Sequence, residues 1–151
     1  HTPARLDDYL GRIVDNLRPS VKHAEAEDIT MCFEVIKTTI ARSAADTRRI
    51  VDALDSSVTE IIWENDSAYR VGEKPSEGYS YIEGKIRDVH IKTNDRDEMN
   101  PIGDTGETYT DVIHRLHTDG YTGFLTIEHW QGEKGTLRGL RQLTEILTDL
   151  K

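Results

Sequence analysis

The chain has 151 residues and a net charge of −9, with 36% hydrophobic and 31% charged residues. That length supports one ordinary hydrophobic core, so we expect a single domain over residues 1–151. The acidity and the lack of a basic cluster argue against a protein that binds the phosphate backbone of nucleic acids, because such proteins present a positively charged surface.

The sequence also argues against a membrane-spanning segment, a signal peptide and an internal disulfide. No stretch reaches the roughly 20 apolar residues of a membrane-spanning helix. His1 to Leu6 also lack the basic and then apolar composition of a signal peptide, so we expect a cytoplasmic protein without membrane contact. The single cysteine, Cys32, cannot form an internal disulfide, and its apolar neighbours predict a small side chain buried in a strand.

Short apolar runs alternate along the chain with segments of helical periodicity, which predicts alternating strands and helices. In chain order we expect a helix over 3–27, a strand over 30–34, a helix that begins at Ser43, a strand over 60–63, a loop over 71–80 with a short helix at 75–82, a strand over 86–92, a long polar loop over 93–108, a helix over 109–117, a strand over 122–128 and a helix over 135–150. Strands separated by helices imply a parallel sheet with helical cover.

The last predicted helix carries apolar residues at helical spacing, which we expect to face the core. These residues are Leu137, Leu140, Leu143, Ile146 and Leu147.

Each predicted strand ends at a residue that can bind a metal. Glu34, Glu64, His90 and Glu128 follow the four apolar runs in that order. Their separations are close to the roughly 30 residues of one strand–helix–strand unit. Because the carboxyl ends of parallel strands converge on one face, three carboxylates and one imidazole are expected to meet there.

Several segments that contain these residues resemble a known family. They are residues 32–34, 62–73, 89–92, 100–107 and 120–128. His90 and Lys92 stand two residues apart, Pro101 opens a glycine-containing loop, and a Gly-Tyr pair precedes Glu128. In this order and spacing they resemble the sugar phosphate isomerase/epimerase family, also called xylose isomerase-like TIM barrels.

The resemblance implies an α/β fold, a (β/α)8 TIM barrel, of which this chain supplies the last four βα units. A complete barrel usually needs about 250 residues. Residues 1–151 would then be the C-terminal half of a barrel and part of a longer protein. An N-terminal half-barrel or a homo-oligomer partner would close it, because an isolated half leaves two open sheet edges.

The resemblance also implies that Glu34, Glu64, His90 and Glu128 bind a divalent metal. Oxygen-rich ligation with one imidazole suits Mn²⁺, which we expect, as well as Mg²⁺, Co²⁺ or Zn²⁺. The chain departs from the family at three positions. Glu64 stands where the family usually has Asp, Ser67 where His or Asn is common, and Thr93 where Asp usually follows.

By the same resemblance, Glu34 and Glu128 are the catalytic base and acid that move a proton beside a carbonyl through an enediolate. The resemblance and the loop positions also suggest four residues that contact substrate. They are Lys92, Ser67, Arg96 and Glu107. Lys92 shares a strand face with His90 because side chains alternate along a strand.

Each of these residues has a simpler interpretation. Glu34 alone could be a strand-end charge, Glu64 could be solvated with Asp66 as the ligand, and His90 alone could be a core histidine. Arg96 and Glu107 fit solvated loop charges as well as substrate contacts.

The sequence therefore predicts a metal-dependent isomerase or epimerase that acts on a small sugar, polyol or hydroxy-carbonyl compound. An inosose-type dehydratase or a hydroxypyruvate isomerase would use similar residues. A non-catalytic barrel fragment that acts as a binding or assembly module is a third hypothesis. An endonuclease IV-like phosphodiesterase is the least favoured, because it needs more His ligands and a basic groove for DNA.

Overall fold

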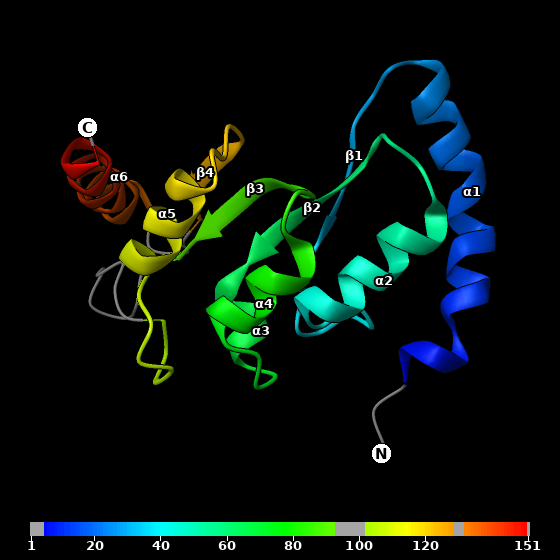
Figure 1. Ribbon diagram of the computed structural model, residues 1–151, viewed down its shortest axis with the longest axis horizontal. Coiled ribbons are helices and arrows are strands. Elements are labelled where there is room, and N and C mark those ends of the chain that lie inside the picture. Colours follow the sequence, from blue (N-terminus) through cyan, green and yellow to red (C-terminus); the bar gives the residue numbers. More distant parts are fainter. Residues whose placement is uncertain (1–4, 93–101, 129–131, 151) are drawn as a thin grey trace.

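A computed structural model describes residues 5–92, 102–128 and 132–150 of the chain. Four parallel strands form one sheet in the order β1-β2-β3-β4, and a helical segment follows each strand (Figure 1). The elements are η1 (Leu6–Asp8), α1 (Leu10–Ala26), β1 (Met31–Glu34), α2 (Ala44–Leu54), β2 (Thr59–Glu64), α3 (Asn65–Tyr69), α4 (Pro75–Ile82), β3 (Ile86–Ile91), α5 (Tyr109–Thr118), β4 (Phe124–Ile127) and α6 (Gly132–Asp149).

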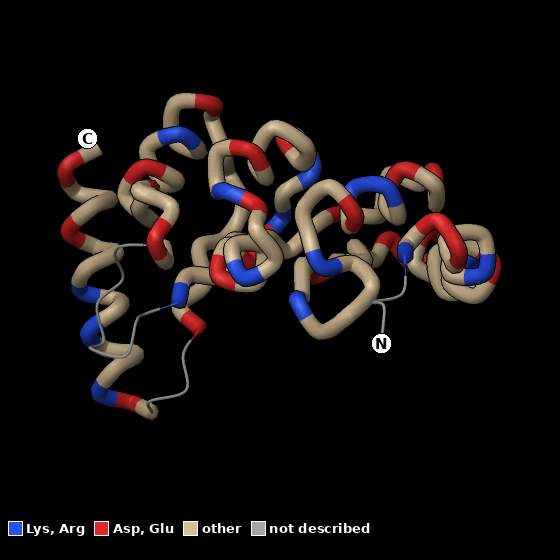
Figure 2. Tube along the Cα trace, turned by 90° about the horizontal axis from the view of Figure 1, so that it is seen from below, with Lys and Arg blue, Asp and Glu red and all other residues tan. Residues whose placement is uncertain are grey.

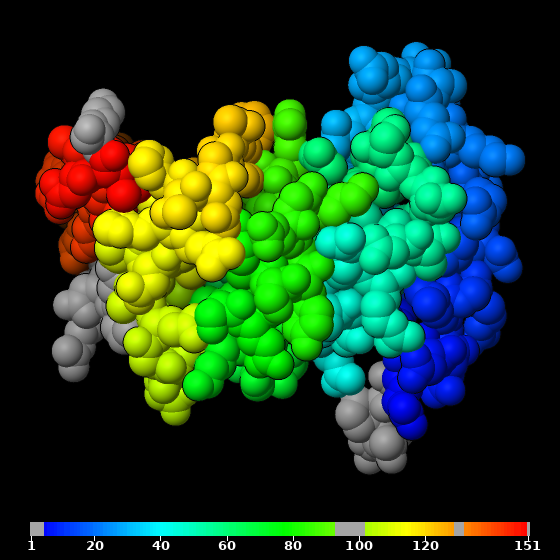
Figure 3. Space-filling model, in the orientation of Figure 1, coloured from blue at the N-terminus to red at the C-terminus, as the bar shows by residue number. Residues whose placement is uncertain are grey.

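The main core lies between one face of the sheet and the helices that cover it. Side chains at alternate strand positions, such as Ile61 and Val89, pack against α2, α4 and α5. A second cluster joins α1 to α2 through residues such as Val14 and Ile50. The βα units succeed one another in chain order across the molecular surface (Figure 3).

The opposite face of the sheet has no helical cover among the described residues. Alternation along the strands directs polar side chains to this face, including Glu34, Asp88, His90 and Thr126. Phe124 also lies at an alternate position on this face and is 58% exposed. In a closed barrel this face would form the interior.

The predicted alternation of strands and helices is confirmed, with one additional helix. Ser43 caps α2 as expected, since its side chain accepts a hydrogen bond from the Asp46 N–H. The short helix α3 was not predicted, because it begins directly after β2 with little apolar period of its own. No helix among the described residues is long and apolar enough to cross a membrane.

Two burial predictions are wrong. Cys32 is exposed, because β1 is an edge strand and the face that Cys32 shares with Glu34 is uncovered. In α6, Leu143 is buried, but Leu137, Leu140 and Leu147 are 47%, 45% and 39% exposed. The helix lies at the open end of the sheet, where its main contact is with β4, so only part of its apolar surface finds a partner.

Charged residues are dispersed over the fold. Lys and Arg are interspersed with Asp and Glu along the described helices and strands (Figure 2). Glu73 has a structural role at the start of α2, where backbone N–H groups lack helical partners. Glu73 accepts hydrogen bonds from Ala44 and Ala45 at the start of α2, at 2.8 and 3.4 Å.

The glycines before β4 have a steric reason. Gly120 has a φ of +72° after α5, a conformation that glycine adopts without strain. At Gly123, a Cβ atom would overlap the backbone carbonyl of Arg87 and the hydroxyl of Tyr121. The close approach of these two segments therefore requires glycine at residue 123.

We expect Gly123→Ala to lower the free energy of unfolding by about 1–3 kcal/mol, because the neighbouring carbonyl belongs to the backbone and must shift. Urea denaturation measures the change. The control is Gly11→Ala in α1, where nothing lies within 4 Å of a Cβ. That variant should gain up to about 1 kcal/mol, and equal effects of the two substitutions would contradict the steric argument.

The buried carboxyl of Glu73 predicts that the stability of the fold depends on pH. Burial raises the pKa of its carboxyl above the ordinary value of 4.5, and the hydrogen bonds from Ala44 and Ala45 oppose this only in part. The folded state therefore binds this proton more tightly than the unfolded state. Its contribution to stability is complete below pH 4.5 and is lost as the pH rises through the raised pKa.

The stability of the native protein relative to Glu73→Gln should therefore fall as the pH rises from 4.5, and should level off above the raised pKa. Urea denaturation in steps of pH measures this difference. Glu27→Gln, at an exposed residue that is not among the charges acting on Glu73, is the control and should leave this difference unchanged. A difference that grows with pH would show that the carboxylate form is the one that the fold stabilises.

Candidate metal centre

The parallel register brings the predicted ligands to one edge of the sheet. Glu34 ends β1, Glu64 ends β2 and pairs in register with His90 of β3, and Glu128 directly follows β4. Backbone hydrogen bonds continue past the strand ends. The Val35 N–H donates to the Ile62 carbonyl at 3.1 Å, and the Glu128 N–H donates to the Ile91 carbonyl at 2.9 Å. These bonds fix the backbone from which the glutamates project.

Three of the four predicted ligands converge. One possible ligand atom each of Glu34, His90 and Glu128 lies within 4.8 Å of the others. The Nδ1 atom of His90 is 3.1 Å from Oε1 of Glu34 and 3.1 Å from Oε2 of Glu128. We call these three residues the strand-end cluster.

The cluster has the donor chemistry of a divalent-cation site. Two carboxylates and an imidazole suit Mn²⁺, Co²⁺ or Zn²⁺, and the carboxylates also suit Mg²⁺. The Oε2 atom of Glu128 is buried and accepts no hydrogen bond from the described residues. Two carboxylate oxygens that lie 3.1 Å from one imidazole nitrogen repel it and each other less when a proton or a cation lies between them. The residues present therefore fit a metal ion.

The electrostatic environment of Glu34 also favours a bound cation. Burial raises the pKa of its carboxyl above the ordinary value, and the negative charges of Glu64 and Glu128 raise it further, while His90 opposes the shift. Ionised Glu34 is thus less stable here than in water. A cation in the cluster would offset that cost.

Asp88 lies near Nε2 of the His90 ring, and the sequence did not lead us to predict it as part of the site. Its Oδ2 atom is 3.8 Å from Nε2 of His90, and both carboxylate oxygens accept from the Thr126 hydroxyl at 2.9 Å. Asp88 therefore adds negative charge beside His90, but at 3.8 Å its carboxylate makes no hydrogen bond to the ring. The available signal was the two-residue spacing from Asp88 to His90, which places both on one strand face.

Lys92 and Glu64 form an ion pair beside the cluster. The Lys92 ammonium is 2.7 Å from Oε1 of Glu64 and 3.5 Å from Oε2 of Glu128. Burial, the largest single influence, lowers the pKa of Lys92, but the Glu64 hydrogen bond and the surrounding carboxylates together raise it above the ordinary value. The structure does not bring Glu64 into the strand-end cluster.

The remaining predicted residues lie apart from the cluster or outside the described residues. Ser67 is buried in α3, three residues after Glu64. The Asp66 carboxylate accepts a hydrogen bond from Nε of Arg70 at 2.7 Å, so its partner is a guanidinium. Arg96, like Thr93, falls outside the described residues.

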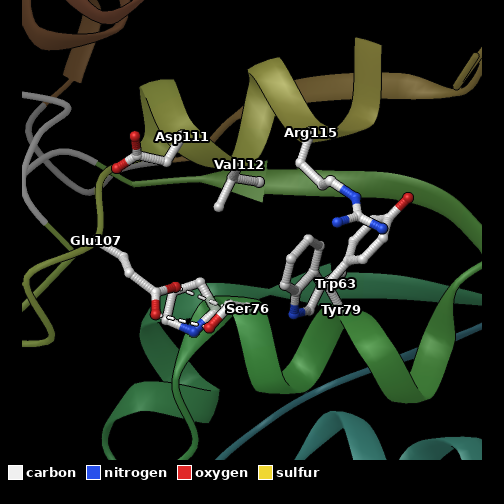
Figure 4. A pocket seen from close by; sticks show the side chains of 8 residues that line it. Trp63, Ser76, Tyr79, Glu107, Asp111, Val112 and Arg115 are labelled. Carbon is white, nitrogen blue, oxygen red and sulfur yellow. Dashed lines mark hydrogen bonds between the residues drawn. The ribbon is translucent and has the colours of Figure 1, made fainter. Parts of the chain in front are cut away.

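Glu107 lies at a cavity on the helical side of the sheet. Its carboxylate accepts hydrogen bonds from the N–H and the hydroxyl of Ser76, both at 2.7 Å, at the start of α4. The cavity has a volume of about 370 Å³ and runs between α4 and α5, with Glu107 towards one end and Arg115 towards the other (Figure 4). Its lining is Trp63, Pro75, Ser76, Tyr79, Glu107, Asp111, Val112 and Arg115, and it includes none of the four predicted ligands.

Residues 1–146 match the family described as the xylose isomerase-like TIM barrel. The chain belongs to this family. Its four parallel βα units are consistent with part of the family's barrel, so the resemblance seen in the sequence and the predicted fold class are confirmed. In such barrels active sites form at the carboxyl ends of the strands, which is where the strand-end cluster lies.

Solved structures of this barrel type resemble the chain in fold. L-ribulose 3-epimerase is 17% identical, with a TM-score of 0.77, over 99% of this chain and 57% of that chain. 3-keto-D-glucoside 4-epimerase from E. coli is 18% identical, with a TM-score of 0.74, over 98% of this chain and 57% of that chain. A probable 3-DHS dehydratase from Bacillus anthracis is 14% identical, with a TM-score of 0.70, over 87% of this chain and 55% of that chain.

The TM-scores of 0.70 to 0.77 show that these structures share the fold of the chain. The chain spans about half of each of these three solved structures, 55% to 57% of their lengths. No curated protein is significantly similar to the chain in sequence.

Proposed function

We propose that the protein is a divalent-metal-dependent isomerase or epimerase that acts on a small sugar, polyol or related hydroxy-carbonyl compound. The supporting observation is the convergence of Glu34 and Glu128 on Nδ1 of His90 at the carboxyl edge of the sheet. The solved structures that share the fold include several sugar epimerases. We expect Mn²⁺ in this site, with Mg²⁺, Co²⁺ and Zn²⁺ as alternatives.

In this proposal Glu34, His90 and Glu128 would hold the metal, which would supply positive charge beside the oxygens of the substrate. Glu34 and Glu128 also exchange the proton at the carbon beside the substrate carbonyl, one as base and the other as acid. The substrate contacts of Lys92, Ser67, Arg96 and Glu107 stay predictions.

Hydrogen exchange at carbon tests the proposal directly. The full-length protein, loaded with Mn²⁺, is incubated with candidate ketoses in D₂O, and NMR follows deuterium entering the carbon beside the carbonyl. Glu34→Gln and Glu128→Gln should each slow this exchange by about 10²–10⁴-fold, because each removes a proton-transfer group. Glu27→Gln, at an exposed residue after α1, is the control and should not change the rate.

Exchange that survives in both glutamate variants would contradict the proposed chemistry. Exchange accompanied by loss of water from the substrate would instead indicate a dehydratase, which begins with the same proton removal. The fold shared with the probable dehydratase from Bacillus anthracis is the reason to include this outcome.

We also propose that further βα units, from an N-terminal half-barrel or from a second copy of the chain, cover the open inner face and the edges of this sheet. The exposed apolar residues Phe124, Leu137 and Leu140 lie on the uncovered face and on α6 at the open end. Apolar surface of this kind on a soluble domain is typically covered by another element.

Residues 1–151 alone should therefore self-associate, and Leu137→Glu with Leu140→Glu should reduce that association. Light scattering after size-exclusion chromatography measures the mass. Tyr81→Glu is the matched control, because Tyr81 is 44% exposed but lies on α4 in the middle of the helical layer. A stable monomer that does not bind a hydrophobic dye would contradict the expected cover.

A further inference from the structure

The uncovered face of the sheet carries further charged residues, closer to the amino ends of the strands than the strand-end cluster. They are Glu60 of β2 and Arg87 and Asp88 of β3, which we call the inner charged residues. Cys32 of β1 pairs in register with Glu60. Burial raises the pKa of the Cys32 thiol, the charges of Glu60 and Asp88 raise it further, and the charge of Arg87 opposes the shift. All three charges therefore lie near one residue of this face.

The inner charged residues comprise two carboxylates and one guanidinium. Nε of Arg87 is 3.7 Å from Oε2 of Glu60, and this oxygen is buried and accepts no hydrogen bond from the described residues. The guanidinium carbon of Arg87 lies 5.2 Å from the centre of the Phe124 ring, which also belongs to the uncovered face. Both oxygens of Asp88 accept from the neutral hydroxyl of Thr126 at 2.9 Å. One negative charge is thus in excess at this level of the sheet.

The imidazole of His90 does not remove this excess. It lies 3.8 Å from Asp88 through Nε2, but its Nδ1 atom is closer, at 3.1 Å, to both Glu34 and Glu128. Any positive charge on the ring is therefore shared with two nearer carboxylates.

Closing the barrel would bury the inner charged residues. Water still reaches them in this sheet, where the Glu60, Arg87 and Asp88 side chains are 31%, 47% and 20% exposed. The interior of a closed barrel is packed with side chains and excludes most water. A carboxylate there is stable only beside a positive charge or several hydrogen-bond donors. The strands that cover this face must therefore supply what this sheet lacks.

A second copy of the chain would not supply it. The copy would bring another Glu60, Arg87 and Asp88 into the same interior, and so would double the excess negative charge. Single chains of this fold are long enough to close the barrel, because this chain covers only 55% to 57% of the three solved structures compared above.

We propose that the sheet is closed by a half-barrel of different sequence in the full-length protein, whose inner face presents a lysine or an arginine to Asp88 and Glu60. This cation balances the excess charge and sets the partner of the uncovered face. The inference rests on the cover proposed above and chooses between its two sources. It requires neither the metal nor the proton transfer.

The sign of one stability change tests the proposal. Asp88→Asn removes the charge but keeps an oxygen that can accept from Thr126. If a cation faces Asp88, the variant leaves it buried without a partner, and the unfolding equilibrium constant of the full-length protein should rise at least about 10-fold. If no cation is there, the variant removes excess charge, and the constant should fall or stay unchanged. Urea denaturation with a chelator present measures the constant without any contribution from metal binding.

Two matched variants show whether charge is the cause. Asp88→Glu keeps the carboxylate and should recover most of the lost stability, whereas an equal loss would make side-chain shape the cause and overturn the proposal. Asp15→Asn, at an exposed residue of α1, is the control and should change the constant by less than about 2-fold. If Asp88→Asn does not fold, Glu60→Gln provides the same test of sign, because it too removes one inner negative charge.

The outcomes separate this inference from the proposed function. An unfolding constant that falls in the Asp88→Asn variant would overturn the cation but leave the proposed chemistry and the cover standing. A native protein in which two 17.2 kDa chains close one barrel would overturn the half-barrel of different sequence. Self-association of residues 1–151 through exposed leucines would not, because it does not require the two inner faces to meet.

Discussion

The rest of the structure depends on the parallel hydrogen bonding of the four strands. This ladder aligns every strand in one direction and continues at Val35 and Glu128, just beyond the strand ends. Side chains alternate between two faces, so apolar residues meet the helices and polar residues meet one another. A site with ligands far apart in sequence therefore needs no local motif, because the sheet brings the strand ends together.

That arrangement concentrates negative charge, and the surrounding residues moderate it. Lys92 pairs with Glu64, Asp66 pairs with Arg70, and the Asp88 carboxylate accepts from Thr126. Among the described residues, Glu34 and Glu128 have as cationic partners only the shared imidazole, if it is protonated, and the more distant Lys92 ammonium. Glu64 and Asp66 thus have cationic partners of their own, whereas Glu34 and Glu128 face His90, which is the distribution expected around a cation.

Two glutamates outside the strand ends have a structural role, because they lie beside the first residues of helices. Glu73 and Glu107 lie in connections between elements, and each accepts hydrogen bonds at the start of a helix, Glu73 at α2 and Glu107 at α4. These contacts fix the loops against the helical layer. From composition alone these two residues could not be distinguished from the glutamates at the strand ends.

The order of strands and helices, the parallel sheet and the strand-end positions of Glu34, Glu64, His90 and Glu128 could all be predicted, because periodicity and spacing are local properties of the sequence. Burial was harder, as Cys32 and Leu137 show, because it depends on which elements cover a face. The sequence by itself determined which residues reach the carboxyl edge. Only the tertiary structure decided that Glu64 pairs with Lys92 and that Asp88 faces His90, because those partnerships depend on side-chain distances across neighbouring strands.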